Sequence, residues 1–479
     1  MKVLNYKKSI STISALFILL ISTVQIVKAE CNQNDFKALK AFYESTNGDK
    51  WANNTGWEII RNNETPPTNC RLGGLKGVFT NRNGRVVKLR FRGSSEAVAG
   101  SLPLGIYLLQ ELEEIEISNA SLSGYIPQTI GYCKNLKVLN LKDNNITGNI
   151  PTSIRFLKNL TNLSLGNNQL RGEIPPQIAN CTALNRVELY NNNFTGCIPS
   201  EIGNLTKMVT LNVSRNNLTG CIPVEIGKCE NLKFCLLNDN SITDAIPHEI
   251  GNLTKLSRLN VTNNKLSGEI PAEIGQLNEI NYFIAGNNNL TGSIPAELGN
   301  CKKLRHCILN NNSINGTIPE EIGDINNLKK FYIYNNQLVG CYPENLRSIC
   351  ETLDRTSNSD EKISNGNIFN ESWENFDSRF MGMCGGSNKI ASTSNELKEI
   401  YPNPSKGIIN LAVEFEENTV NASSEISIYN ATGSMVFNQS ISNKLMNNYT
   451  INLNHLNKGN YIIMLNNNGA FHYQKFILN

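Results

Sequence analysis

A repeat of 24 residues runs through most of the sequence and restricts the possible folds more than any other feature. Prolines recur at this spacing without slippage from Pro103 to Pro343. A glycine stands three residues before nearly all of these prolines, and Asp244 is the one departure in that column. A period of this length, kept over so much of the chain, indicates stacked supersecondary units rather than a compact globule.

Each unit repeats the same order of apolar and polar residues. Leu139-Asn140-Leu141 precedes Asn144, for example, and asparagines recur in that column as far as Asn336. The alternation predicts a short strand with one buried face. Stacked strands about 4.8 Å apart would bury that face in a parallel sheet. The column asparagine is expected to turn inward, where its amide can hydrogen-bond backbone groups of the adjacent turn.

The unit LKVLNLKDNNITGNIPTSIRFLKN resembles the plant-type leucine-rich repeat, LxxLxLxxNxLxGxIPxxIGxLxN, and residues 101–346 follow this pattern almost throughout. The resemblance implies an α/β solenoid, a right-handed superhelix with a parallel β-sheet on its concave face. It also implies ligand recognition by exposed strand positions or by the neighbouring loops. Because one fold can serve many functions, the function has to be argued from the exposed residues.

The start of the chain predicts a signal peptide over residues 1–29. Lysines near the N-terminus precede an apolar run at 13–21, and Val27-Lys28-Ala29 resembles a small-residue cleavage site. The run is short for a membrane-spanning helix, and no later segment is longer and equally apolar. We therefore expect an exported chain with no transmembrane segment after cleavage.

Residues 30–100 are expected to cap the N-terminal end of the repeats. Asp35 can cap a helix in this segment. The apolar face of that helix would carry Phe36, Leu39, Phe42 and Tyr43. Asn83-Gly84 predicts a hairpin turn. The stretch ALKAFYESTNGDKWANNTGW resembles caps that precede such repeats in bacterial and plant proteins, and this resemblance implies a disulfide between Cys31 and Cys70.

The repeat pattern stops after Pro343, and residues 347–397 are rich in Ser, Asn and Asp. We expect a C-terminal cap and linker there. Two of the cysteines Cys341, Cys350 and Cys384 are expected to bridge, with Cys341–Cys350 the preferred pair.

Residues 398–479 differ from the repeats, because strand-like runs alternate with turn residues and predict a small all-β sandwich. The runs span 408–413, 425–429, 434–437, 449–453, 461–465 and 471–478. The segment resembles the type IX sorting domain of Bacteroidota. The residues that carry the resemblance are Tyr401, Pro402, Asn403, Pro404, Gly407, Gly459, Tyr461 and Lys475.

That resemblance implies export by the signal peptide and then by the type IX secretion machinery. It leaves two destinations open, release from the cell or attachment to the outer-membrane surface. An ordinary adhesive β-domain is the alternative interpretation of this segment.

The exposed strand positions change character along the repeats. Late coils carry apolar and aromatic residues at these positions, namely Tyr282, Ile284, His306, Ile308, Tyr332 and Tyr334. Phe234 and Leu236 lie further back, beyond the polar coil of Arg258 and Asn260. Adjacent strands would place the six late residues within roughly 15 Å of one another. Such a patch predicts a binding site, although strand propensity alone, or cover by residues 347–397, would also explain these residues.

The cysteines of the repeats fall into two kinds. Six occupy columns that elsewhere hold leucine and are expected to be small buried hydrophobes: Cys133, Cys181, Cys229, Cys235, Cys301 and Cys307. Cys197 and Cys221 share one column in adjacent coils and could either bridge or stay reduced. The total of 13 is odd, so at least one cysteine has no partner within the chain.

The formal net charge of +3 and the lack of a dense basic stretch argue against nucleic acid as a partner. No catalytic motif, cofactor motif or metal-ligand spacing is present, and no segment outside the repeats and the tail is long enough for a typical catalytic domain. The expected function is binding of an extracellular protein or glycan by a secreted or surface-attached chain. The alternatives are an inhibitor of an extracellular hydrolase and a receptor-like ligand sensor. An ice-binding surface is disfavoured because no ordered threonine array is visible, and a secreted hydrolase is the remotest alternative.

Overall fold

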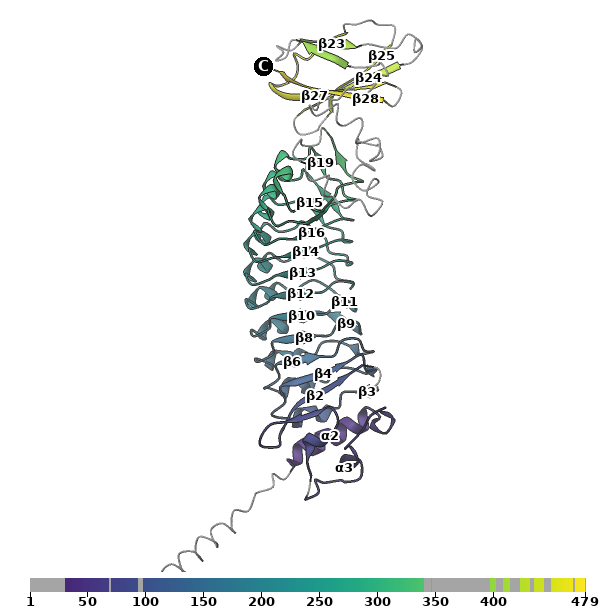
Figure 1. Cartoon of the computed structure of the whole chain (residues 1–479), viewed down its shortest axis with the longest axis vertical. Coiled ribbons are helices and arrows are strands. Elements are labelled where there is room, and N and C mark those ends of the chain that lie inside the picture. Colours follow the sequence, from purple (N-terminus) through teal and green to yellow (C-terminus); the bar gives the residue numbers. More distant parts are fainter. Residues whose placement is uncertain are drawn as a thin grey trace, which may run out of the picture. The chain divides into compact units, whose positions relative to one another are not determined.

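The computed structural model describes residues 31–68, 70–93, 98–339, 346, 397–401, 408–413, 423–430, 435–442, 449–467 and 470–478. The predicted signal peptide lies outside these residues. The chain divides into two compact units, one formed by residues 1–171 with 180–184 and the other by residues 172–179 with 185–479. Repeat coils occur in both units (Figure 1).

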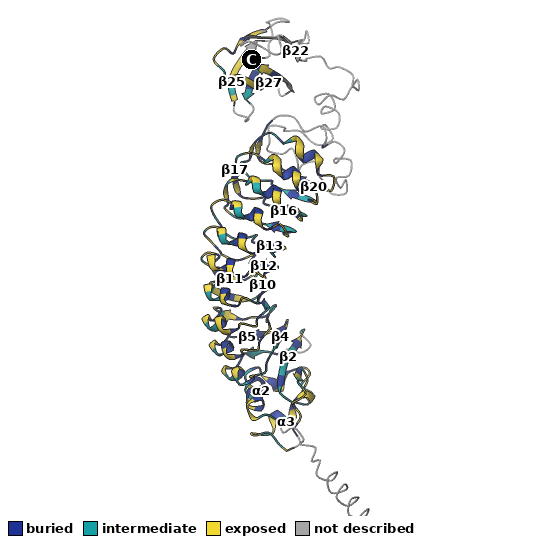
Figure 2. Cartoon of the chain, turned by 90° about the vertical axis from the view of Figure 1, so that its left-hand side faces the viewer, coloured by how far each residue is buried: buried dark blue, intermediate teal, exposed yellow. Residues whose placement is uncertain are grey.

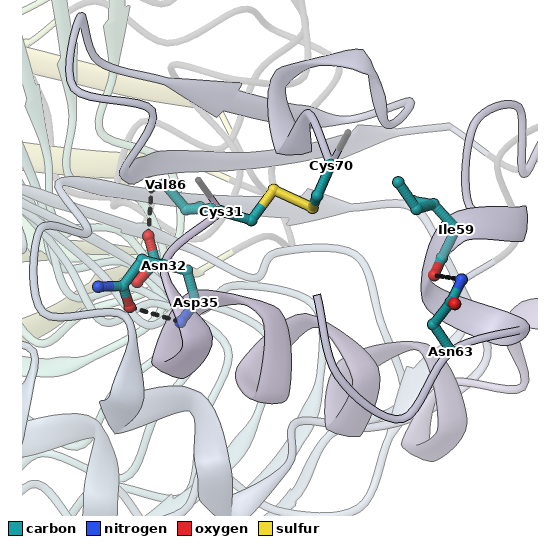
Figure 3. The surroundings of a disulfide bond; sticks show 7 residues. All are labelled: Cys31, Asn32, Asp35, Ile59, Asn63, Cys70 and Val86. Atoms are coloured by element: carbon teal, nitrogen blue, oxygen red, sulfur yellow. Dashed lines mark hydrogen bonds between the residues drawn. A yellow bond between two sulfur atoms is a disulfide. The ribbon is translucent and has the colours of Figure 1, made fainter. Parts of the chain in front are cut away.

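The cap begins with helix α2 (Gln33–Ser45), and the helix is capped by Asn32 and not by Asp35 as the sequence suggested. The Asn32 side chain accepts hydrogen bonds from the backbone N–H groups of Asn34 and Asp35. The Asp35 carboxylate is fully buried instead, and it accepts hydrogen bonds from the Arg85 side chain. It also accepts one from the backbone N–H of Val86 (Figure 3). Asp35 therefore ties the helix to the hairpin.

An aromatic cluster forms the core of the cap. Phe42, Trp51, Trp57 and Phe91 lie with their ring centroids 5.0 to 6.4 Å apart, and each of these side chains is at most 5% exposed. The Trp51 indole donates to the Thr46 carbonyl at 2.8 Å, which satisfies its N–H inside the core. The remaining helical segments of the cap are η1 (Gly48–Lys50), α3 (Glu58–Arg61) and η2 (Leu72–Gly74).

In the first unit the hairpin begins a sheet. The strands are β1 (Val78–Thr80), β2 (Val86–Arg92), β4 (Glu114–Ser118), β6 (Val138–Asn140) and β8 (Asn162–Ser164). β1 and β2 pair in antiparallel fashion, which confirms the predicted hairpin, and the later strands add in parallel. Ile115, Leu139 and Leu163 share one register column and are fully buried.

In the second unit seven strands pair in parallel. They are β10 (Arg186–Glu188), β12 (Thr210–Asn212), β13 (Phe234–Leu236), β14 (Arg258–Asn260), β16 (Tyr282–Ile284), β18 (His306–Ile308) and β20 (Lys330–Tyr332). Every pairing joins residues 24 apart, as in Leu211 with Cys235. Buried and exposed positions alternate along these coils (Figure 2). The predicted period-2 pattern is thus confirmed.

Each column proline from Pro103 to Pro319 precedes a short 3₁₀ helix. These helices are η4 (Leu104–Leu108), η5 (Gln128–Tyr132), η6 (Thr152–Phe156), η7 (Pro176–Asn180), η8 (Ser200–Asn204), η9 (Val224–Lys228), η10 (His248–Asn252), η11 (Ala272–Gln276), η12 (Ala296–Asn300) and η13 (Glu320–Asp324). The proline ring holds φ near −65°, and its missing N–H is not needed at the start of a helix.

Short strands in the segments between the sheet and these helices add a second set of pairings. The strands are β3 (Gly100–Ser101), β5 (Leu122–Ser123), β7 (Thr147–Gly148), β9 (Gln169–Glu173), β11 (Asn193–Thr195), β15 (Ser267–Glu269), β17 (Asn289–Thr291), β19 (Asn315–Gly316) and β21 (Gln337–Leu338). The column glycines from Gly100 to Gly316 stand here with positive φ, and Asp244 adopts the same left-handed backbone at φ 62°. Aspartate tolerates this conformation better than most residues, so the departure in the column leaves the coil unchanged.

The column asparagines join neighbouring coils. The Asn144 amide nitrogen donates to the carbonyls of Ile117 and Leu141 at 2.7 and 3.0 Å. Its oxygen accepts from the backbone N–H groups of Ala120 and Leu122. The same arrangement recurs around later asparagines such as Asn288. The buried amides therefore satisfy backbone groups that no strand partner reaches.

The C-terminal segment forms two antiparallel sheets, β22-β23-β26 and β25-β24-β27-β28. The strands are β22 (Leu397–Tyr401), β23 (Ile408–Val413), β24 (Ser423–Asn430), β25 (Met435–Ser442), β26 (Tyr449–Asn452), β27 (Gly459–Asn467) and β28 (Ala470–Leu478). Both sheets contribute to one core that includes Ile428, Ile451 and Phe476. The all-β tail is confirmed, and β22 is a strand that the sequence did not predict.

Candidate functional site

The six late residues of the predicted binding patch lie on adjacent strands. We call Tyr282, Ile284, His306, Ile308, Tyr332 and Tyr334 the late patch. Strands β16, β18 and β20 present five of them, and Tyr334 follows β20. Each side chain is partly exposed. Ile284, Ile308 and Tyr332 occupy one register column, so an apolar row crosses the strands.

The aromatic residues of the late patch contact one another. The rings of Tyr282 and His306 meet edge to face with centroids 4.8 Å apart. The rings of Tyr332 and Tyr334 lie 6.5 Å apart at 51°. Edge-to-face and tilted ring pairs are favourable arrangements, and they join Tyr282 to His306 across neighbouring coils and Tyr332 to Tyr334 within one coil.

Two basic residues belong to this surface, and the sequence analysis did not single out either as a binding residue. The Arg258 guanidinium lies 4.2 Å from the centroid of the Tyr282 ring. Lys330 occupies the register position beside His306, and Tyr332 pairs in register with Ile308. The row that runs across the strands is therefore Arg258, Tyr282, His306 and Lys330.

The surroundings of His306 disfavour the charged form of its imidazole. Partial burial lowers the pKa of His306, and the positive charges of Lys330, Arg258, Lys329 and Arg305 lower it further. The pKa of the nearby Tyr334 hydroxyl is raised, first by burial and then by Tyr332.

The two earlier candidates lie apart from the late patch. Phe234 and Leu236 are on β13, and Phe234 is 39% exposed. Arg258 and Asn260 of β14 stand between them and Tyr282 with Ile284. The structure brings the six late residues together, and strand β14 separates this pair from them.

The predicted sorting residues are distributed over the tail. Tyr461 is buried in β27, donates its hydroxyl hydrogen to the Asn457 carbonyl at 2.6 Å and stacks on Phe476. Gly459 begins β27, and Tyr401 ends β22. Lys475 belongs to β28. The other four predicted residues, Pro402, Asn403, Pro404 and Gly407, lie outside the described residues.

The cysteines behave as two classes. The disulfide expected between Cys31 and Cys70 is present (Figure 3). Cys197 and Cys221 are exposed and free, so the structure has no bridge between them. Cys341, Cys350 and Cys384 lie outside the described residues, and their predicted pairing stays a prediction.

The six leucine-column cysteines are buried as predicted. Burial raises the pKa of Cys133 to about 12 and that of Cys181 to about 11. Four of the six also donate S–H to a carbonyl of the preceding coil, as Cys181 does to Ile154 at 3.1 Å. These thiols therefore fill the core and satisfy a backbone acceptor.

Among the described residues, no group of three or more His, Cys, Asp or Glu side chains could hold a metal ion. In the same part of the chain, no helix has both the length and the apolar character needed to cross a bilayer.

Two kinds of family model match the chain. Leucine-rich-repeat models match residues 110–170 and, in a second version, residues 183–205, 207–229, 255–277 and 303–325. A secretion system C-terminal sorting domain matches residues 399–479. The comparison with curated proteins finds no match.

Several solved structures resemble the chain. The plant peptide hormone receptor RGFR1, solved in complex with RGF2, is 35% identical with a TM-score of 0.56 over 60% of this chain and 45% of that one. The PEPR1–AtPEP1 structure is 26% identical with a TM-score of 0.51, over 65% of this chain and 50% of that one. A plant ice-binding protein at 21% identity and a TM-score of 0.51, over 71% of this chain and 95% of that one, shares the fold.

The chain thus spans half or less of the length of the RGFR1 and PEPR1 chains. Its fold is typical of binding modules rather than of enzymes. The sorting domain indicates secretion by the type IX machinery to the cell surface or the extracellular space. The stacked coils, the two repeat models and the sorting domain together identify the chain as a leucine-rich-repeat protein with a C-terminal secretion-system sorting domain.

Proposed function

We propose that this protein is exported, with residues 1–29 as its signal peptide and residues 398–479 as its sorting domain, and binds an extracellular protein or glycan through the late patch. The domain limits that accompany this proposal are a cap over 30–100, repeats over 101–346 and a second cap with linker over 347–397. Binding is the whole of the proposed activity, and no catalytic step is part of it.

The observation that carries the proposal is the continuous aromatic and apolar surface over β16, β18 and β20. Soluble proteins rarely gather exposed tyrosine, histidine and isoleucine side chains on one face without a partner for them. Tyrosine is also enriched among the residues that contribute most to binding energy. The likeness to a receptor solved with its peptide hormone supports the receptor-like version of this function, in which the ligand is a polypeptide.

The test uses the full chain on an array of peptides and glycans. The triple variant Tyr282→Ser, Tyr332→Ser, Tyr334→Ser is expected to lose the array signals, with an affinity at least about tenfold lower. The matched control replaces three exposed tyrosines outside the patch, Tyr107, Tyr125 and Tyr132, with serine. It should bind as the unmodified chain does.

Circular dichroism of both triple variants serves to check that each one keeps the fold. If the patch variant is folded and retains full affinity for every ligand on the array, the late patch is not the binding site.

A further inference from the structure

The strands that carry and flank the late patch bear positive charges without negative ones. We call Lys233, Arg258, Arg305, Lys329 and Lys330 the late cations. They stand within or directly before β13, β14, β18 and β20. No aspartate or glutamate occurs at 233–236, 257–260, 281–284, 305–308 or 329–332. At these positions, every charged side chain is therefore basic.

The first unit arranges its strand cations differently. Lys88 and Arg90 of β2 both pair with Glu114 of β4, at 3.0 and 2.6 Å. Arg92 pairs with Glu116 at 2.5 Å. Burial raises the pKa of Glu114, but hydrogen bonds from Arg90 and Lys88 outweigh this effect, so its pKa lies below the ordinary value. Here each positive charge has a carboxylate on the next strand.

The late cations have no such partners. Within the described ranges, none of the five forms an ion pair with an aspartate or a glutamate of the chain. The Nε of Arg258 is buried and has no hydrogen-bond acceptor among those residues. Buried donors normally have a partner, and a carboxylate is the group that matches a guanidinium best.

The apolar row specifies the rest of the ligand. Ile284 and Ile308 are neighbours in register and lie beside the row of Arg258, Tyr282, His306 and Lys330. Isoleucine cannot hydrogen-bond a sugar hydroxyl, whereas it packs well against an apolar amino-acid side chain. One row thus offers positive charge at its two ends, and the row beside it offers apolar contact.

We propose that the ligand of the late patch is an acidic polypeptide segment, with one carboxylate on Arg258, a second carboxylate on Lys330 and an apolar side chain on Ile284 and Ile308. This inference rests on the proposed function. The inference adds the chemical class of the ligand to that function. We choose an acidic segment because its charge is complementary to that of the late cations.

The test measures binding of the full chain to immobilised short peptides that combine leucine or phenylalanine with aspartate and glutamate. A matched set replaces each acid by its amide, and polygalacturonate and heparin serve as acidic glycans. The acidic peptides should bind about tenfold more tightly than the amide set, and this preference should shrink as salt rises.

The variant Arg258→Gln, Lys330→Gln is expected to lose the preference for acidic peptides. The control Lys228→Gln, Lys265→Gln changes the net charge equally at two exposed lysines outside the patch and should keep it. If peptides bind through the late-patch tyrosines with no preference for acids, the inference fails and the proposed function stands. Binding of the acidic glycans alone has the same consequence. If no probe depends on those tyrosines, both fail.

Discussion

A single asparagine side chain shows how closely the repeat connects sequence to structure. Asn144 bonds backbone groups of its own coil and of the preceding one, and the 24-residue column predicts this role because every coil presents the same unmet groups. Arg258 and Lys330 could not be assigned in the same way. Within its own coil, each of these residues looks like an ordinary surface charge. Only the strand register places Arg258 beside Tyr282 and Lys330 beside His306.

The variant Asn144→Ala should destabilise the protein by about 3 kcal/mol, because buried N–H and C=O groups lose their partners. The neighbouring Asn145 is exposed, so Asn145→Ala serves as the control and should cost under about 0.5 kcal/mol. Denaturant unfolding followed by circular dichroism measures both. Equal midpoints for the two variants would show that the column amide does not hold the coils together.

At the scale of elements, the apolar spacing of residues 36–43 was enough to predict α2, and Asn83-Gly84 was enough to predict the hairpin. The start of the helix was assigned wrongly, because Asn32 and Asp35 are both residue types that cap helices. The two residues take different roles because Arg85, 50 residues beyond Asp35 in the chain, binds the Asp35 carboxylate. A contact at that distance leaves no local pattern in the sequence.

Arg85→Met should therefore destabilise the cap by about 3 kcal/mol or more, since the buried Asp35 carboxylate loses its charged partner. The Lys40–Glu64 pair provides the comparison, because the Glu64 side chain is 90% exposed. Glu64→Gln should cost less than about 1 kcal/mol. Thermal unfolding of the two variants, followed by tryptophan fluorescence, compares their losses of stability. A loss no greater for Arg85→Met than for Glu64→Gln would contradict this role of the buried pair.

At the scale of the whole molecule, the sequence predicted the class of each part because each has its own pattern of periodicity. The repeats bury a column every 24 residues, and the tail alternates strands with turns around a separate core. β22 was not predicted, because Leu397–Tyr401 is short and lies beside the polar stretch taken as a linker. The core of the tail is built from tail residues alone, so we expect the tail to unfold in a transition of its own.

Phe476→Ala should lower the unfolding temperature of the tail alone, by removing a fully buried ring from its core at a cost of about 4 kcal/mol. Differential scanning calorimetry of the full chain should show one transition moving and the transition of the repeats unchanged. A common shift of both would mean that the tail and the repeats unfold cooperatively.

The constant register of the strand pairs also bears on how such a chain can change in evolution. Since β13, β14 and β16 pair residue for residue at one fixed interval, loss of a single coil would let Phe234 take the place of Arg258 beside Tyr282 with no change of pleat or facing. Gain of a coil by duplication of one 24-residue unit would likewise leave the backbone pairing unchanged. The row of exposed side chains on the sheet can therefore be lengthened, shortened or reordered by one coil at a time, while the backbone that carries it stays the same.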